Sequence, residues 1–366
     1  MTMRFNTSLA SSWVVLLHSL LVSLSVLTYS MPISEPKFMQ RVHQHHCIEG
    51  RRSFLEISAS SMACLVATNH PASAIESDIS FASSVLTGGN FDCLLDLPPI
   101  TKGCARLYLC RHGQTENNRL HLVQGARVDP PINGRGHDQA QRLGIAVSKL
   151  ISSSAHRDAV PHLAVHSKLR RARETAEVLT STASSQSMMS TNESKLKVYG
   201  VLPSLQEIDF GSFEGKDVNS CKREMMQTFA SWSIGNIDAR TGGEGESGRE
   251  VLVRAVQALE ELANIASSTS TTQSSSILAV SHSTYLRVLL SLANDSPLAE
   301  TALWKIENGS VNVVDVNIEG KRRLRTGIFG GALVDRLRGN NELHLDMPEA
   351  HLIRRNEVRH LEGLDV

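Results

Sequence analysis

The 366-residue sequence has few aromatic side chains and no excess charge of either sign. Phe, Trp and Tyr make up 4% of the residues, which leaves few rings on which nucleic-acid bases would stack. Lys and Arg together number 37, as do Asp and Glu, so the formal net charge is zero. A balanced charge argues against non-specific binding to nucleic acid or to an anionic membrane surface. We therefore expect no nucleic-acid partner.

Cysteine is also scarce, and its spacing is not that of a metal or disulfide framework. No CxxC pair occurs, and no cysteine has zinc-like spacing to a histidine. These absences argue against a disulfide-dense secreted scaffold and a structural zinc module. The six cysteines are Cys47, Cys64, Cys93, Cys104, Cys110 and Cys221.

The apolar run near the N-terminus, residues 13–27, is too short to span a bilayer as a helix. Its 15 residues reach about 22 Å at 1.5 Å each, against a hydrocarbon core of about 30 Å. With Arg4 before it, the run suits a signal peptide at residues 1–30, cleaved near Ser30; a buried core helix is the alternative. We expect no integral membrane span in the mature chain, and the sequence leaves the oligomeric state open.

A second targeting signal follows in residues 31–103. Gly50-Arg-Arg-Ser-Phe-Leu55 resembles a twin-arginine export motif, and a weakly apolar stretch then leads to Ala72-Ser73-Ala74. Two signals in series resemble the targeting of thylakoid-lumen proteins in algae whose plastid is reached through the secretory pathway. We expect a plastid location, with secretion or another endomembrane compartment as the alternative. Residues 75–103 are interpreted as a disordered linker, and the histidines of 43–47 as a solvated spacer rather than a metal site.

From Arg106 onward, short apolar runs alternate with stretches of helical periodicity. Ser247 and Glu250 form a capping box that marks the start of one helix. Strands separated by helices of this size predict an α/β fold, a three-layer αβα sandwich with a mostly parallel central sheet. Strands are expected at 106–110, 162–166, 197–202, 277–281, 311–318 and 322–328, the last two paired through Glu319-Gly320, and helices at 134–152, 169–179, 217–232, 247–266 and 284–293.

Charged and imidazole side chains follow the ends of four predicted strands. His112 and His282 each end a strand, so parallel neighbours would place both at one edge of the sheet, where ligands bind in such folds. The other two strands lead to Arg170-Arg171 and to Glu207. Two histidines, several arginines and one carboxylate indicate a site for a phosphate.

Phosphoryl transfer explains each of these residue types. Arg111 and Arg171 have planar guanidinium groups that clamp phosphate oxygens, whereas Arg170, its neighbour on the helix, is expected in solvent. A neutral imidazole is a nucleophile near pH 7, and a carboxylic acid at Glu207 would protonate the leaving alkoxide. Glu214 is interpreted as structural.

The extended motifs resemble the histidine phosphatase superfamily, in its phosphoglycerate-mutase-like branch. They occur in the family's order over about residues 105–318. They are Leu107-Tyr-Leu-Cys-Arg-His-Gly-Gln-Thr-Glu-Asn-Asn118, Gln124-Gly125, Asp129-Pro-Pro-Ile132 with Gly136, Ser167-Lys-Leu-Arg-Arg-Ala-Arg-Glu-Thr-Ala176, Leu205-Gln-Glu-Ile-Asp-Phe-Gly-Ser-Phe-Glu-Gly215, Val280-Ser-His282 and Asn308-Gly-Ser-Val311.

The resemblance implies a role for each matching residue. His112 would be the phosphorylated nucleophile, Glu207 the proton donor and acceptor, and no metal or organic cofactor is implied. Arg111, Arg171 and His282 would form the phosphate pocket, lined by Asn118, Thr115, Gln124 and Gly125. Glu246-Ser247 matches a recurrent family segment near the site entrance without a clear role. The catalytic domain would span 104–328, followed by a C-terminal extension, 329–366, interpreted as a packed helix.

Three functions are compatible with this predicted site: two enzymatic activities and phosphate binding without catalysis. True mutases of the family carry a longer, basic insertion before the second histidine, whereas only 282 − 207 = 75 positions separate Glu207 from His282 here. We therefore predict a phosphomonoester phosphatase acting on a small phosphorylated substrate, with a phosphoglycerate mutase or a non-catalytic phosphate-binding protein as alternatives. Ser283 departs from the glycine usual after the second histidine, which puts the substrate range in doubt.

The targeting prediction can be tested on the processed protein. Successive cleavage near Ser30 and Ala74 would leave an N-terminus close to residue 75. N-terminal sequencing of the protein purified from its source checks this, and a mature chain that begins before Arg51 contradicts the twin-arginine interpretation.

Overall fold

The computed structural model describes residues 88–186, 196–233, 236–268, 276–296, 298–324 and 345–364. The chain divides into two compact units, Met1–Thr68 and Asn69–Val366, and all described residues belong to the second. Both targeting signals and the histidines of 43–47 lie outside the described residues. Within the described part of the chain, no helix combines the length and apolarity needed to cross a membrane.

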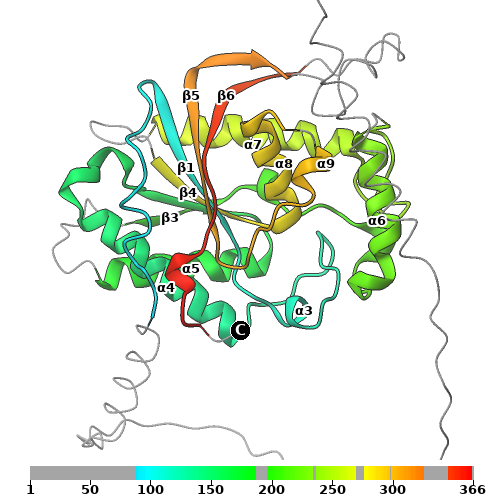
Figure 1. The fold of residues 1–366 in the computed structure, drawn as a ribbon, viewed down its shortest axis with the longest axis horizontal. Helices are drawn as coiled ribbons and strands as arrows, with labels where there is room; N and C mark the ends of the chain where they lie inside the picture. Colours follow the sequence, from blue (N-terminus) through cyan, green and yellow to red (C-terminus); the bar gives the residue numbers. More distant parts are fainter. Residues whose placement is uncertain are drawn as a thin grey trace, which may run out of the picture. The chain divides into compact units, whose positions relative to one another are not determined.

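A six-stranded mixed sheet forms the centre of the fold, in the order β3-β2-β4-β1-β5-β6 (Figure 1). The pairs β1–β4, β2–β4 and β2–β3 are parallel, and β5 pairs antiparallel with both β1 and β6. The predicted α/β class and mostly parallel sheet are confirmed. The strands are β1 (Cys104–Arg111), β2 (Leu163–His166), β3 (Lys197–Val201), β4 (Ser276–Ser281), β5 (Val311–Arg323) and β6 (Asp346–Glu357).

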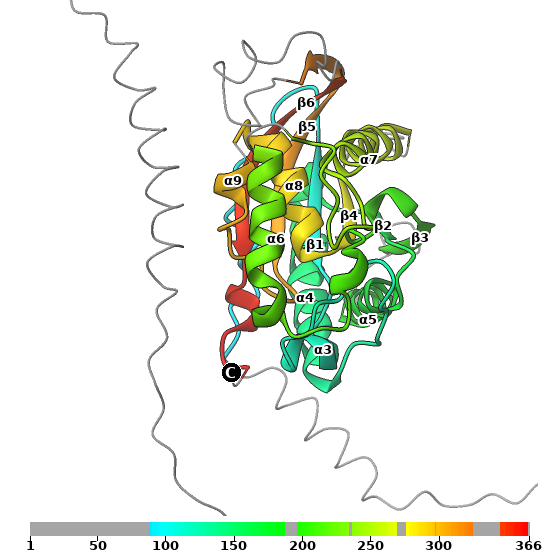
Figure 2. The same cartoon turned by 90° about the vertical axis from the view of Figure 1, so that its right-hand side faces the viewer.

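Helices cover both faces of this sheet (Figure 2). Alternate residues of β1 point to opposite faces: Leu107 and Leu109 pack in one apolar cluster with α7 and α8, whereas Tyr108 and Cys110 pack in the other with α4 and α5. A strand buried on both faces is apolar at nearly every position, as the sequence of β1 is. The longer helices are α4 (Gly134–Ser152), α5 (Arg170–Gln186), α6 (Val218–Ser233), α7 (Gly248–Ser268) and α8 (Ser283–Asn294); α3 (Glu116–Arg119) and α9 (Leu298–Thr301) are short.

The start of α7 is fixed by the predicted capping box. Ser247 N–H donates to Glu250 Oε2 at 2.8 Å, and Glu250 N–H donates to Ser247 Oγ at 3.3 Å. These reciprocal bonds satisfy two helix-terminal donors that would otherwise lack partners. The segment Gly245–Ser247 is thereby held at one end of the helix.

The C-terminal part of the sheet differs from the sequence-based expectation. The hairpin turn predicted at Glu319-Gly320 is wrong, because β5 continues through these residues to Arg323 and pairs with β6. The helix predicted in the C-terminal extension is also wrong, since 346–357 is an edge strand whose Met347 and Ala350 lie in the core. An edge strand tolerates Pro348 and exposes basic side chains, which obscures the alternation of apolar and polar residues. A register shift between Val316 and Lys321 takes up the extra residues.

The disordered linker predicted for residues 75–103 is wrong for its C-terminal part, which packs on the domain. Cys93 and Leu94 are each 1% exposed and pack in the same apolar cluster as α4. Arg354 of β6 and Arg359 both donate to the Cys93 carbonyl and form ion pairs with Asp96. The segments on either side of the predicted catalytic domain are therefore packed together on it.

Candidate active site

Two buried imidazoles meet where β1 and β4 end. Arg111 pairs with Ser281 in the parallel register, so the next residue of each strand is a histidine at the same edge of the sheet. The ring centroids of His112 and His282 lie 5.1 Å apart. The prediction that both histidines share one edge is confirmed.

The hydrogen bond of His112 decides which of its nitrogens is free. Its Nδ1 lies 2.7 Å from the Gly113 carbonyl oxygen, which only accepts, so Nδ1 carries the proton and Nε2 the lone pair. Burial and the nearby Arg171 and Arg111 guanidinium groups hold the pKa of His112 well below its usual range. A Cβ at Gly113 would overlap the Gly136 carbonyl, so this close approach requires glycine. The arrangement keeps a neutral imidazole with an unprotonated Nε2.

His282 has the opposite tautomer. Its Nδ1 accepts a hydrogen bond from Arg171 Nε at 3.2 Å, which leaves the proton on Nε2, facing Ser167 Oγ at 2.7 Å. Burial and the charge of Arg171 lower the pKa of His282 as well. Ser167 was not among the predicted site residues, although it directly follows β2 and the same strand-end rule would have identified it.

Arg171 is the guanidinium that orders the surrounding loop. It is fully buried, and its Nη2 and Nη1 donate to the carbonyls of Gly125 at 2.9 Å and Val128 at 3.0 Å. Arg170 instead turns to solvent, its side chain 53% exposed and paired with Glu174, as predicted. Because adjacent residues lie on different faces of a helix, only one of the two arginines enters the site.

Arg111 supplies a second cation with an unused donor. Its Nη1 donates to the Ile306 carbonyl at 2.7 Å, and its buried Nε has no hydrogen-bond partner among the described residues. Burial and the neighbouring cations Arg287 and Arg171 lower the pKa of Arg111 to about 10, so it stays charged at neutral pH. Arg287, which the sequence did not indicate, thus adds to a positive potential that favours an anion.

The side chains of Thr115, Asn118 and Gln124 form one connected group beside His112. Thr115 Oγ1 donates to Gln124 Oε1 at 3.0 Å and accepts from Asn118 N at 3.2 Å. Asn308 joins the group, with its Nδ2 3.0 Å from Asn118 Oδ1 and 3.1 Å from the His112 carbonyl. These bonds turn the buried Nε2 of Gln124 away from Thr115, and it has no partner in the described part of the chain. An unpaired buried donor of this kind suits an oxygen of an anion.

Glu207 is held by the N-terminus of α8. Its Oε1 accepts from Tyr285 N at 2.9 Å and Ile208 N at 3.0 Å, and its Oε2 from Thr284 N at 3.2 Å. Burial raises the pKa of Glu207, against the opposing effect of these N–H groups and of Arg171. A carboxyl with a raised pKa keeps its proton further toward neutral pH and is suited to general acid chemistry.

Glu214, interpreted as structural, bonds only to backbone. It accepts from the N–H groups of Arg127 at 2.9 Å, Val128 at 2.8 Å and Phe210 at 3.1 Å. A Cβ at Gly125 would overlap the backbone carbonyl oxygen of Ile208 as well as Glu214 Oε1, so glycine is required there too. Across the described residues, no group of three or more side chains suited to metal ligation converges.

A family model matches the chain over the residues that build this site. The model of the histidine phosphatase superfamily (branch 1) matches residues 107–327. The chain therefore belongs to the histidine phosphatase superfamily.

Individual proteins that resemble this chain share between 20% and 26% of the aligned residues with it. The protein named "Probable phosphoglycerate mutase GpmB" from Escherichia coli O1:K1 / APEC is 26% identical over 210 residues, 57% of this chain and 84% of its own length. Among solved structures, the mycobacterial glucosyl-3-phosphoglycerate phosphatase in complex with VO3 is 20% identical with a TM-score of 0.47, covering 69% of this chain and 99% of its own. The alpha-ribazole phosphatase from Shigella flexneri is 25% identical with a TM-score of 0.42, covering 58% of this chain and 91% of its own.

The two adjacent arginines of α5 provide a matched test of the anion site. Replacing Arg171 with Gln removes a buried cation and should weaken the binding of inorganic phosphate by roughly 10- to 100-fold, since a charged hydrogen bond contributes about 1.5–3 kcal/mol. The exposed Arg170→Gln change should leave binding within about twofold. Isothermal titration calorimetry of the full chain, with thermal unfolding to verify folding, measures both. Equal losses in the two variants would contradict the assignment.

Proposed function

We propose that this protein is a phosphomonoester phosphatase that acts on a small phosphorylated metabolite through a phosphohistidine intermediate. The observation that carries the proposal is the unprotonated Nε2 of His112, which follows from its Nδ1 hydrogen bond and from the lowered pKa beside Arg171 and Arg111, in the same site as a carboxyl of raised pKa. Family membership supports the same chemistry.

In the first step, Nε2 of His112 attacks phosphorus, and the bond from phosphorus to the ester oxygen breaks. Arg111, Arg171 and the Gln124 amide stabilise the negative charge on the equatorial oxygens. The proton of Glu207 moves to the departing alkoxide, so the alcohol leaves neutral. His282, held by Arg171 and Ser167, lines the phosphate beside His112.

In the second step, water attacks the phosphohistidine. The Glu207 carboxylate takes a proton from the water as the new phosphorus–oxygen bond forms and the bond from phosphorus to Nε2 breaks. Inorganic phosphate leaves, and the protonated acid and neutral imidazole are restored.

A phosphoglycerate mutase is the second candidate, because a curated relative carries that name. A mutase must shield its phosphohistidine from water until the substrate has reoriented. The connection between α6, which ends at Ser233, and α7, which begins at Gly248, contains Gly242, Gly243 and Gly245, and such a glycine-rich segment is poorly suited to a tight cover. A stopped assay separates the two activities, since rapid interconversion of 3- and 2-phosphoglycerate with little free phosphate would favour the mutase.

The proposed setting is a plastid, reached through the secretory pathway. Its support is the pair of targeting signals in residues 1–74, and the N-terminus of the processed protein tests it. In that setting, sugar phosphates are the substrates to screen first, within a broader panel of phosphomonoesters.

The nucleophile is tested by replacing His112 with Ala. Phosphate release from any hydrolysed monoester should fall by more than roughly 10³-fold, because the phosphohistidine intermediate cannot form without Nε2 of His112. Labelled substrate should give an acid-labile phosphoenzyme in the wild type only. The exposed His351→Ala change is the control and should retain activity. A wild-type protein that binds phosphate but hydrolyses no monoester would instead support a non-catalytic binding role.

The pH dependence of hydrolysis should follow the two shifted groups. The raised pKa of Glu207 means that kcat/KM for an alkyl phosphate falls as pH rises through that value and the acid proton is lost. The lowered pKa of His112 means that its protonation causes no loss near pH 6.5, only well below it. Glu207→Gln should remove the alkaline fall while the ionisation of the substrate itself is unchanged. An identical alkaline fall in that variant would contradict the role of Glu207.

A further inference from the structure

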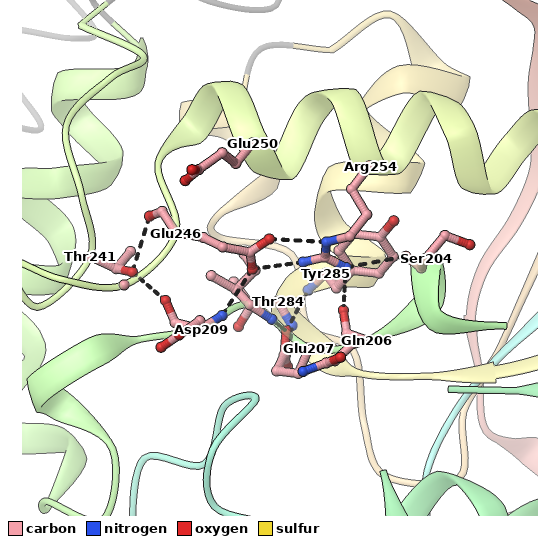
Figure 3. A network of polar contacts seen from close by, with 12 residues as sticks. Ser204, Gln206, Glu207, Asp209, Thr241, Glu246, Glu250, Arg254, Thr284 and Tyr285 are labelled. Atoms are coloured by element: carbon pink, nitrogen blue, oxygen red, sulfur yellow. Dashed lines mark hydrogen bonds and ion pairs between the residues drawn. The ribbon is translucent and has the colours of Figure 1, made fainter. Parts of the chain in front are cut away.

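Arg254 and the Glu246-Ser247 segment lie next to Glu207, the proposed general acid (Figure 3). Arg254 projects from α7, and its Nε and Nη2 donate to the two carboxylate oxygens of Glu246 at 3.0 and 2.7 Å (Figure 3). Glu246 Oε2 also accepts from the N–H of Asp209 at 2.9 Å. The ion pair is therefore tied to the backbone two residues beyond Glu207.

The same guanidinium also holds the backbone on the other side of Glu207. Its Nη1 donates to the carbonyls of Gln206 at 2.6 Å and Ser204 at 3.1 Å. Gln206 is the residue directly before the acid. The peptide segments before and after Glu207 are thus fixed by one arginine and its carboxylate partner.

Arg254 also contacts Tyr285, the residue whose backbone N–H binds the Glu207 carboxyl. The guanidinium carbon of Arg254 lies 4.3 Å from the ring centroid of Tyr285, whose backbone N–H donates to Glu207 Oε1. In Figure 3, dashed lines join Arg254 to Glu246, and Tyr285 and Glu207 lie beside this pair. The side chains of Arg254 and Glu246 are 18% and 21% exposed, so the network is mostly shielded from solvent.

We propose that Arg254, anchored by Glu246, is a positioning residue for the general acid Glu207. The role rests on the proposed phosphatase function. A general acid must lie within about 2.6–3.2 Å of the oxygen that it protonates, and a misplacement of about 1 Å costs on the order of 10²-fold in rate. Arg254 acts on this distance through the backbone, without contact to the substrate.

Only an arginine satisfies all these contacts at once. One edge of the planar group pairs with a carboxylate, one nitrogen reaches two carbonyls, and the flat face lies over an aromatic ring. A lysine keeps the charge but carries all its donors on one nitrogen, so it cannot hold the backbone segments before and after Glu207 at the same time. Arg254→Lys is therefore the informative substitution.

The test compares two esters with leaving groups of different quality. p-Nitrophenyl phosphate releases a stable anion that needs no proton, whereas glycerol 3-phosphate releases an alkoxide that depends on the acid. The value of kcat/KM reports the steps through phosphoryl transfer to His112, so later attack by water does not enter. Arg254→Lys in the full chain should lower kcat/KM for glycerol 3-phosphate by about 10- to 100-fold and for p-nitrophenyl phosphate by less than about threefold. Glu207→Gln should show the same selectivity.

Two further variants keep the test decisive. Glu246→Gln weakens the ion pair with Arg254 at nearly constant volume. It should lower kcat/KM for glycerol 3-phosphate relative to that for p-nitrophenyl phosphate by a smaller factor than Arg254→Lys does. This variant provides a second measurement if Arg254→Lys fails to fold. Arg249 lies on α7 with Arg254 but pairs at the surface with Asp238, which precedes the helix. Arg249→Lys is therefore the matched control and should leave kcat/KM for both esters unchanged. Equal losses for the two esters, no loss, or the same selectivity in Arg249→Lys would overturn the positioning role. A wild-type chain that hydrolyses neither these two esters nor any ester of the phosphomonoester panel would instead contradict the phosphatase function itself.

Discussion

The parallel pairing of β1 with β4 is the constraint from which the site follows. Their register brings His112 and His282 to one edge of the sheet with 5.1 Å between the rings. A shift of one residue in this register would turn one imidazole to the opposite face of the sheet, because side chains alternate along a strand. The apolar residues of β1 and β4, buried on both faces, fix that register through the two clusters on either side. Core packing thus determines the distance between two polar groups that make no contribution to the core.

Electrostatic balance gives the site its preference for phosphate. The guanidinium groups of Arg111 and Arg171 lie beside two imidazoles that burial and those same cations keep neutral. The carboxyl of Glu207 is nearby but has a raised pKa, so it offsets the positive charge only in part. Positive charge held in a poorly solvated place is costly unless an anion compensates it. The residues proposed to bind the phosphate therefore also favour the protonation states that the proposed transfer requires.

The sequence predicted much of this site because most of its side chains follow the ends of parallel strands. His112, His282, Arg171 and Glu207 follow strand ends, and parallel strands place their ends together, so one topological rule locates four side chains. The same rule applies to Ser167, which was overlooked because a serine carries no charge to draw attention. Contacts such as Asn308 with the His112 carbonyl depend on loops whose course no periodicity specifies. The edge strand β6 was missed because many of its residues are partly or fully exposed, which obscures the apolar pattern. Residues 88–103 were interpreted as a linker because the segment contains Gly88-Gly89 and Pro98-Pro99.

The C-terminal segment also bonds to the turn that contains Asn308. His360 Nε2 donates to the Gly309 carbonyl at 3.0 Å, and the N–H of Glu307 donates to Asn356 Oδ1 at 2.8 Å. These bonds support the turn from which Asn308 contacts the His112 carbonyl. Residues 356–360 follow every proposed catalytic residue in the sequence, so a ribosome adds the support for that turn only after those side chains. During synthesis, the turn is therefore complete before the residues that hold it in place.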